Sequence, residues 1–316
     1  MTKYRYSLPQ LSDRIFLSDG GIETTLIFQE GLDLPYFASF HLLQNEAGRE
    51  ALRKYFRTYA SLAQRLEKGL ILESATWRAN PDWGAKLGYT PAALAAANRQ
   101  AIELLHEIRA EFETEKTPIV VSGCLGPRGD GYVPADTMTA EEAQAYHRAQ
   151  VEAFTQAGAD LVTAITMNYV EEAIGIAQAA RAFAMPVVIS FTVETDGHLP
   201  TGDSLKASIE KMEEATGGAP AYYMINCAHP THFAQALAGG ESWAGKIRGL
   251  RSNASAKSHA ELNESTELDE GDPVELGRQH RELLGSLRNL NVFGGCCGTD
   301  HRHVEEICRA CSGAGR

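Results

Sequence analysis

The sequence predicts an α/β protein of the (β/α)8 class, a TIM-type barrel of eight parallel strands. Eight short apolar segments recur along the chain, and segments of helical composition alternate with them. The length of 316 residues suits such a barrel, since these domains commonly exceed about 250 residues around one core. A doubly wound open sheet would give the same local pattern, so closure into a barrel is an expectation.

The expected strands are apolar runs of three to five residues that end in small or polar residues. Runs of this kind are typical of strands covered on both faces, as in a parallel sheet. In chain order they are Ile15–Ser18, Leu70–Glu73, Ile119–Ser122, Leu161–Ile165, Val187–Phe191, Tyr222–Asn226, Ile247–Leu250 and Asn291–Phe293.

The expected helices are longer segments with apolar residues at helical spacing. Pro91 and Pro273 suit first helical turns, where a missing N–H costs nothing. The segments are Glu50–Lys68, Pro91–Glu115, Ala140–Ala157, Val170–Phe183, Ser204–Thr216, Thr231–Ala238 and Pro273–Leu287.

The polar stretch Ser252–Asp272 lacks periodicity and is expected to form a long loop after the seventh strand, of the kind that often acts as a lid. No linker divides the chain. We therefore expect one domain over residues 1–316.

Composition and charge narrow the classes of partner. Apolar residues make up 44% of the chain and charged residues 22%, which is typical of a globular protein. A formal net charge of −12 argues against binding to nucleic acid or anionic membranes, because both depend on basic patches. No apolar run has the length of a membrane span, and the first residues lack the pattern of a secretory signal. A cytoplasmic enzyme acting on small molecules is expected.

Three cysteines lie where a barrel enzyme places its chemistry. Cys227 follows the sixth strand, and Cys296 with Cys297 follows the eighth, so all three would meet at the carboxyl-terminal rim. Three thiolates favour Zn²⁺, and three protein ligands leave a fourth position for substrate. A thiol at that position would become a thiolate, which is the nucleophile for alkyl transfer.

Two other interpretations of these cysteines stay open. The glycines at 294, 295 and 298 would give the backbone freedom for adjacent ligands, but a disulfide between the neighbouring cysteines is a chemical alternative. Buried cysteines can also be simple packing residues.

Several motifs resemble the zinc-dependent homocysteine S-methyltransferase family, which includes betaine- and S-methylmethionine-homocysteine methyltransferases. The resemblance covers nearly the whole chain. Its motifs are LSDGGIETTL, GCLGPRGDGY, AGADLV, SFTVETDGHLPTGDSL, INCAHP and GGCCGTDHRHVEEI.

The resemblance implies a (β/α)8 barrel with zinc on Cys227, Cys296 and Cys297 and with homocysteine sulfur completing the site. By the same resemblance, Asp19 helps to hold the amino-acid acceptor, and Gly20 and Gly21 allow close approach of the backbone. Asn226 takes its place beside the first ligand as a further substrate-binding residue.

One position departs from the family pattern. Where relatives carry a Glu that binds the acceptor's ammonium group, this chain has Ile165, so an ion pair that contributes to specificity is missing. Glu73, at the end of the second strand, stands where relatives more often have an uncharged residue. It could replace the missing carboxylate or bind a different cationic group.

The primary hypothesis is a zinc-dependent methyltransferase that moves a methyl group from a small onium donor to a thiolate. The donors considered are S-methylmethionine, S-adenosylmethionine and a betaine, and the first acceptor is homocysteine, giving methionine. The alternatives are another thiol or donor with the same chemistry, and a zinc-binding or thiol-sensing protein without catalysis. The sequence leaves open the oligomeric state and a separate corrinoid-carrying partner.

Some further residues have both a functional and a structural interpretation. Trp77 and Trp83 could form an aromatic wall for an onium donor, or could simply pack under a rim loop. His229 could touch substrate. Cys308 and Cys311 form a CxxC pair that is expected to be structural.

Overall fold

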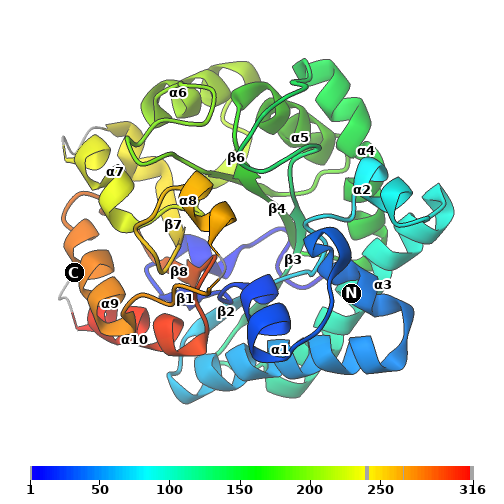
Figure 1. The fold of residues 1–316 in the computed structure, drawn as a ribbon, viewed down its shortest axis with the longest axis horizontal. Coiled ribbons are helices and arrows are strands. Elements are labelled where there is room, and N and C mark those ends of the chain that lie inside the picture. The colour runs from blue at the N-terminus through cyan, green and yellow to red at the C-terminus, as the bar shows by residue number, and fades with distance from the viewer. Residues whose placement is uncertain (1, 239–241, 266, 314–316) are drawn as a thin grey trace.

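A computed structural model describes residues 2–238, 242–265 and 267–313. Its eight parallel strands close into a barrel in chain order (Figure 1). The strands are β1 (Phe16–Leu17), β2 (Gly69–Glu73), β3 (Ile119–Leu125), β4 (Leu161–Met167), β5 (Val187–Phe191), β6 (Pro220–Asn226), β7 (Ile247–Ser252) and β8 (Val292–Gly295). All eight predicted strands are confirmed. Closure is made between β1 and β8, where Phe16 pairs with Val292 and Leu17 with Phe293.

Helices form the outer layer around these strands (Figure 1). They are α1 (Glu46–Arg65), α2 (Pro81–Lys86), α3 (Pro91–Phe112), α4 (Ala140–Ala157), α5 (Val170–Ala182), α6 (Leu205–Thr216), α7 (Pro230–Leu237), α8 (His259–Glu264), α9 (Pro273–Leu283) and α10 (His301–Ser312). The seven predicted helical segments are confirmed within a few residues. Pro91 and Pro273 open α3 and α9 after the N-caps Thr90 and Asp272, as expected.

The amino-terminal half of the barrel interior is filled by an apolar layer. Phe16, Ile71, Val120, Leu161, Val188, Tyr222, Met224 and Val292 point inward and pack with Leu8, which precedes the barrel. On β7 a glycine makes room, because a Cβ on Gly249 would lie 2.6 Å from the Met224 side chain. The apolar layer closes this end of the barrel and leaves the opposite rim for polar groups.

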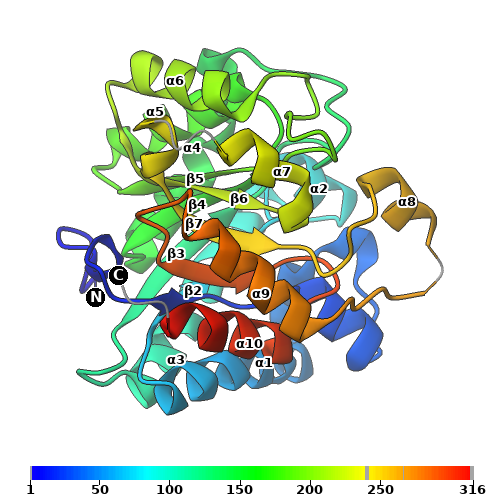
Figure 2. The same ribbon diagram turned by 90° about the vertical axis from the view of Figure 1, so that its left-hand side faces the viewer.

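The predicted loop after β7 contains one short helix, α8. A capping box between Ser258 and Glu261 starts this helix, with each side chain bonded to the other's backbone N–H. Figure 2 shows α8 standing out from the body of the protein. Its first residue, His259, nevertheless lies against the site, since Nε2 is 2.5 Å from the carbonyl oxygen of Cys227.

Within the part of the chain that the structure describes, no helix is both long and apolar enough to cross a membrane.

Candidate metal and acceptor site

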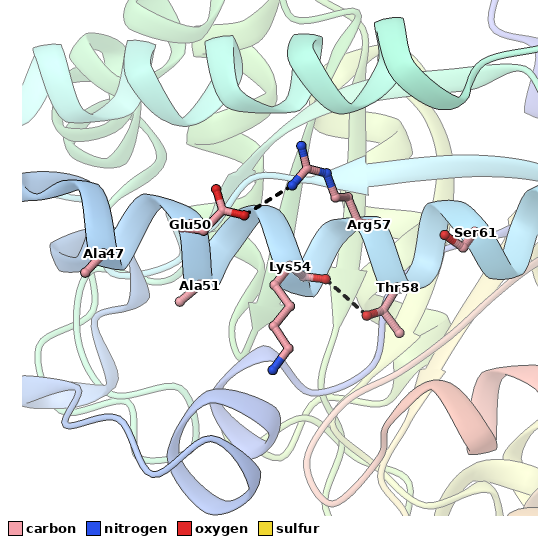
Figure 3. Close-up of a pocket in the computed structure, with 7 residues that line it drawn as sticks. All are labelled: Ala47, Glu50, Ala51, Lys54, Arg57, Thr58 and Ser61. Atoms are coloured by element: carbon pink, nitrogen blue, oxygen red, sulfur yellow. Dashed lines mark hydrogen bonds and ion pairs between the residues drawn. The ribbon is translucent and has the colours of Figure 1, made fainter.

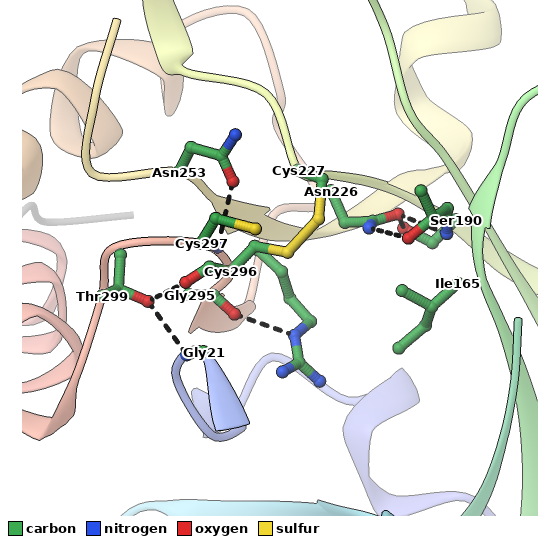
Figure 4. The surroundings of a disulfide bond; sticks show 12 residues. Gly21, Ile165, Ser190, Asn226, Cys227, Asn253, Gly295, Cys296, Cys297 and Thr299 are labelled. Carbon is green, nitrogen blue, oxygen red and sulfur yellow. Dashed lines mark hydrogen bonds between the residues drawn. A yellow bond between two sulfur atoms is a disulfide. The ribbon is translucent and has the colours of Figure 1, made fainter. Parts of the chain in front are cut away.

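The three predicted ligands meet at the carboxyl-terminal rim. The Sγ atoms of Cys227, Cys296 and Cys297 lie within 4.8 Å of one another. In this structure Cys227 and Cys296 form a disulfide, with Cα atoms 5.3 Å apart, and Cys297 is a free, exposed thiol beside it (Figure 4). The disulfide considered from the sequence joined adjacent cysteines, whereas this one joins β6 to β8. Reduction would present three soft sulfur donors in one place, a set that suits Zn²⁺.

The backbone around the cysteines explains how neighbouring residues reach one point. Cys227 has a positive φ of 51°, a conformation that is uncommon away from functional sites. Gly298 supplies the turn after Cys297 with a φ of 78°, and Asn253 accepts a hydrogen bond from the Cys297 N–H at 3.1 Å. Gly294 and Gly295 do not have positive φ. Their role is close packing, because a Cβ on Gly295 would lie 2.0 Å from Thr299 Oγ1.

Asn226 ties the ends of three strands together. Its Oδ1 accepts hydrogen bonds from the Thr166 N–H at 2.9 Å and the Ser190 hydroxyl at 2.6 Å, and its Nδ2 donates to Thr166 Oγ1. Thr166 has a φ of 64°, and the β4–β5 register shifts between Ala164 and Met167. Such irregularities re-aim side chains. Ile165 lies at this irregularity, near the disulfide and Asn226 (Figure 4).

Asp19, at the end of β1, is buried and already has two protein partners. Its Oδ1 forms an ion pair with Nη2 of Arg251 at 2.7 Å, and its Oδ2 accepts a hydrogen bond from the Tyr55 hydroxyl at 2.9 Å. Gly20 and Gly21 allow close packing against the protein itself, because added Cβ atoms would lie 2.6 Å from the Tyr59 hydroxyl and 2.5 Å from the Cys296 carbonyl oxygen.

Arg251 was not identified from the sequence, because a lone Arg at a strand end has no motif. It lies on β7, is buried, and donates to the carbonyl oxygens of Gly20 and Gly295 at 3.2 Å. Burial acts to lower the pKa of Arg251, but the carboxylates of Asp19 and Glu73 outweigh it and raise that pKa above its ordinary value. The guanidinium is therefore a permanent cation inside the barrel.

Glu73 lies on β2 in register with Ser122 and is 5% exposed. Burial raises its pKa to about 7, against the opposing effect of Arg251. Its Oε2 has no hydrogen-bond partner among the described residues. We call Asp19, Glu73 and Arg251 the charged layer. Glu23, from the GGIETT segment, is a further carboxyl group near it, and burial raises its pKa to about 7 as well.

A second group that the sequence did not reveal borders Cys297. The hydroxyl of Tyr132 lies 3.9 Å from Cys297 Sγ, and its ring contacts His259 with centroids 4.1 Å apart. Nδ1 of His259 lies 3.1 Å from a carboxylate oxygen of Glu194. The loop after β3 and the loop containing α8 therefore meet over the thiols.

Trp77 and Trp83, for which both an aromatic wall and simple packing were open, contact cations of the protein itself. The Arg78 guanidinium lies 4.2 Å from the centroid of Trp77 and 4.0 Å from that of Trp83. Lys86 also lies over Trp83, at 3.9 Å. These indoles bind side-chain cations of the same chain, so they are not a free surface for an onium donor.

The remaining candidate residues have structural partners. His229 is the N-cap of α7, and its Nδ1 lies 2.8 Å from the Thr231 hydroxyl. Burial lowers its pKa to about 4. Cys308 and Cys311 are buried on α10, in agreement with the structural role expected for them.

A shallow hollow on the outer face of α1 is separate from the site (Figure 3). Its charged residues are paired, Arg57 with Glu50 at 3.2 Å and Lys54 with Glu30 at 2.7 Å. We assign no function to it. Its lining residues are Ala47, Glu50, Ala51, Lys54, Arg57, Thr58 and Ser61.

Fold and site together define a (β/α)8 barrel with a cluster of three cysteines at its carboxyl-terminal rim. The homocysteine S-methyltransferase family model matches residues 16–311, and the chain therefore belongs to that family. A homocysteine S-methyltransferase from Escherichia coli K12 is 29% identical over 205 residues, which cover 61% of this chain and 63% of that protein. The match thus spans less than two thirds of the relative's length.

Solved structures support the same fold. The oxidized form of the E. coli homocysteine methyltransferase MmuM has a TM-score of 0.76, with 21% identity over 96% of this chain and 99% of the other. The metallated form of MmuM has a TM-score of 0.73, with the same identity and coverage.

Proposed function

We propose that this protein is a zinc-dependent S-methyltransferase that moves a methyl group from a small onium donor to a thiol. The observation that carries the proposal is the convergence of Cys227, Cys296 and Cys297 at the carboxyl-terminal rim, with Sγ atoms within 4.8 Å. Membership of the homocysteine S-methyltransferase family supports homocysteine as the first acceptor to test. The donors to test are S-methylmethionine, S-adenosylmethionine and a betaine.

The reaction would be a direct displacement. The acceptor sulfur forms a bond to the methyl carbon while the bond from that carbon to the donor's positive sulfur or nitrogen breaks, and the donor leaves as a neutral sulfide or amine. Zinc, when bound, would lower the pKa of a coordinated thiol so that the thiolate is present at neutral pH. The thiol proton would pass to solvent when the acceptor binds.

The chain's own residues would hold the acceptor and the metal ligands. We propose that Cys227, Cys296 and Cys297 bind the zinc in the reduced protein, and that Asp19, Gly20, Gly21 and Glu73 line the place where the acceptor binds. Asn226 would act beside them by fixing the strand ends next to Cys227, since its side chain bonds to Thr166 and Ser190.

The test is zinc content together with methyl transfer by the reduced protein. Wild type is compared with Cys297→Ala, which removes one ligand, and with Cys308→Ala, which removes a buried thiol of α10. We expect one zinc per wild-type chain and transfer to homocysteine from at least one donor. Cys297→Ala should lose the zinc and more than about a hundredfold of the activity, since loss of even a supporting residue costs roughly 10–100-fold. Cys308→Ala should retain both.

Three other outcomes of this experiment would contradict or change the proposed function. Reduced protein that holds no zinc would overturn the proposal. Zinc binding without transfer from any donor to any thiol would favour the non-catalytic zinc-binding or thiol-sensing alternative. Homocysteine that becomes an acceptor only in Ile165→Glu would mean that the natural acceptor is a different thiol.

A further inference from the structure

Arg251 places a buried positive charge where the acceptor would bind. Its Nη2 binds Asp19 and the Gly20 carbonyl oxygen, and its Nε donates to the Gly295 carbonyl oxygen. Nη1 has no acceptor among the described residues. Gly295 precedes Cys296, so this guanidinium is bonded directly to the strand that carries two of the thiols.

Of the two family positions that would hold an amino-acid acceptor, one is engaged by the protein and the other is apolar. One oxygen of Asp19 lies 2.7 Å from Nη2 of Arg251 in a buried ion pair, and the other accepts a hydrogen bond from the Tyr55 hydroxyl. Ile165, which is 7% exposed, brings an apolar side chain and no charge. An ammonium group buried beside Asp19 would have to displace Arg251 from its ion pair, and the remaining carboxyl groups, Glu73 and Glu23, have pKa values that burial raises to about 7, so their ionised forms are disfavoured.

A carboxylate group of the acceptor, in contrast, would find a cationic donor at this place. A guanidinium with an unused N–H donor is the side chain best suited to bind one, and such charge-assisted hydrogen bonds are among the strongest in proteins. The nearby Glu73 could assist, because its Oε2 has no partner among the described residues and a carboxyl group that retains its proton can donate to another carboxylate.

We propose that Arg251 is a specificity-determining residue that binds the carboxylate of the acceptor, and that the acceptor class is small thiol carboxylates, with or without an ammonium group. This inference rests on the proposed function, since it presupposes a thiol bound at the metal. Under this inference the protein recognises the thiol by its carboxylate rather than by its ammonium group.

Three thiols, in each of which three carbons separate the sulfur from the charged group, distinguish these two modes of recognition. Homocysteine carries both charged groups, 4-mercaptobutanoate lacks the ammonium, and 3-mercaptopropylamine lacks the carboxylate. Reduced protein is loaded with Co²⁺, and each thiol is titrated while the visible absorption of the cobalt reports sulfur binding. This measurement needs no methyl donor and no turnover.

We expect 4-mercaptobutanoate to bind at least as tightly as homocysteine. The dissociation constant of 3-mercaptopropylamine should be higher by on the order of tenfold or more, the effect of losing one hydrogen bond to a charged group. Equal or tighter binding of 3-mercaptopropylamine would overturn the inference. Protein that binds no Co²⁺, or whose cobalt spectrum no thiol changes, would instead overturn the proposed function, and the inference with it.

Substitutions on β7 test the residue itself. Arg251→Met removes the cation and releases Asp19, so the order of the two one-charge thiols should reverse. A purely structural role would weaken all three thiols alike. Arg248→Met is the matched control, since Arg248 lies on the same strand but bonds to the carbonyl oxygens of Gln10 and Ser12, and it should leave the order unchanged.

Arg251→Lys keeps the charge and covers the case in which Arg251→Met does not fold. 4-Mercaptobutanoate should still bind more tightly than 3-mercaptopropylamine, but by a smaller ratio, because a lysine ammonium cannot bind Asp19 and the Gly295 carbonyl oxygen and also present a donor in the place of Nη1. An unchanged or larger ratio in Arg251→Lys would contradict the assignment.

Discussion

The two levels of the barrel interior differ in chemistry although they lie on the same strands. In the apolar layer, Ile71 contributes a hydrocarbon side chain from β2, and two residues further along the same strand Glu73 contributes a carboxyl group. On β7 the corresponding step leads from Gly249 to Arg251. Two residues along a strand span only about 7 Å. The apolar layer closes the barrel, whereas the charged layer lies next to the thiols. Burial of the charged layer lowers the stability of the fold, and the packing of the apolar layer must offset this loss.

The largest expected effect on stability comes from breaking the buried ion pair. Asp19→Asn leaves Arg251 without its closest carboxylate, and removal of one partner from a buried pair costs about 3–5 kcal/mol of unfolding free energy. Urea unfolding of wild type and Asp19→Asn at neutral pH measures this loss of unfolding free energy. Asp33→Asn, at an exposed carboxylate, should change the value by less than about 0.5 kcal/mol. A cost for Asp19→Asn as small as that of Asp33→Asn would show that the pair does not matter to the fold.

A somewhat smaller effect is expected from Glu73, and it depends on pH. Burial raises the pKa of Glu73 from 4.5 to about 7, so the protonated form suits the folded state. Its contribution is fully present below about pH 4.5 and is lost as pH rises toward 7 and above. This difference between the pKa values of the unfolded and folded states corresponds to about 3 kcal/mol.

In wild type the unfolding free energy should fall between pH 5 and pH 8. In Glu73→Gln this decrease should be smaller, by up to about 3 kcal/mol. Glu23 titrates in the same range and should keep part of the pH dependence in the variant. Glu103→Gln, on the exposed face of α3, serves as the control. A pH profile of Glu73→Gln that matches wild type would mean that Glu73 is ionised in the folded protein throughout.

The smallest effect belongs to the apolar layer. Ile71→Val removes one methylene from a fully packed position and should cost about 1 kcal/mol. Unlike the change at Glu73, this cost should be the same at pH 5 and pH 8, because no charge is involved. A cost that varies with pH would show that the packing of the apolar layer depends on the charges of the charged layer.

Much of the architecture could be predicted from the sequence, because strands and helices follow from local patterns. Val187–Phe191 and Ala140–Ala157 are predicted at the residues observed, and the other predicted elements lie within a few positions of the observed ones. The short helices α2 and α8 are not predicted, since six residues carry too few periodic positions to indicate a helix. Closure of the sheet was a choice between two topologies with the same local signal, and only the pairing of β1 with β8 decided it.

Some residues of the site could likewise be predicted from the sequence, and others could not. Cys227, Cys296 and Cys297 could be grouped from the sequence, because the carboxyl ends of parallel strands share one rim and the cysteines directly follow two of those strands. Glu73 and Ile165 could be singled out against the family pattern. The partnership of Arg251 with Asp19 could not be foreseen, since 232 positions separate them and an ion pair between strands has no local signature.

The sequence by itself determined the order of strands and helices, the meeting of three cysteines and the family, since each depends on residue types at fixed spacing. Only the tertiary structure decided which charges neutralise one another inside the barrel. It paired Arg251 with Asp19, left an oxygen of Glu73 without a partner among the described residues, and engaged Trp77 and Trp83 with Arg78. The physical reason is that the strength of a charge depends on burial and on neighbours within a few ångströms, and folding alone brings those neighbours together.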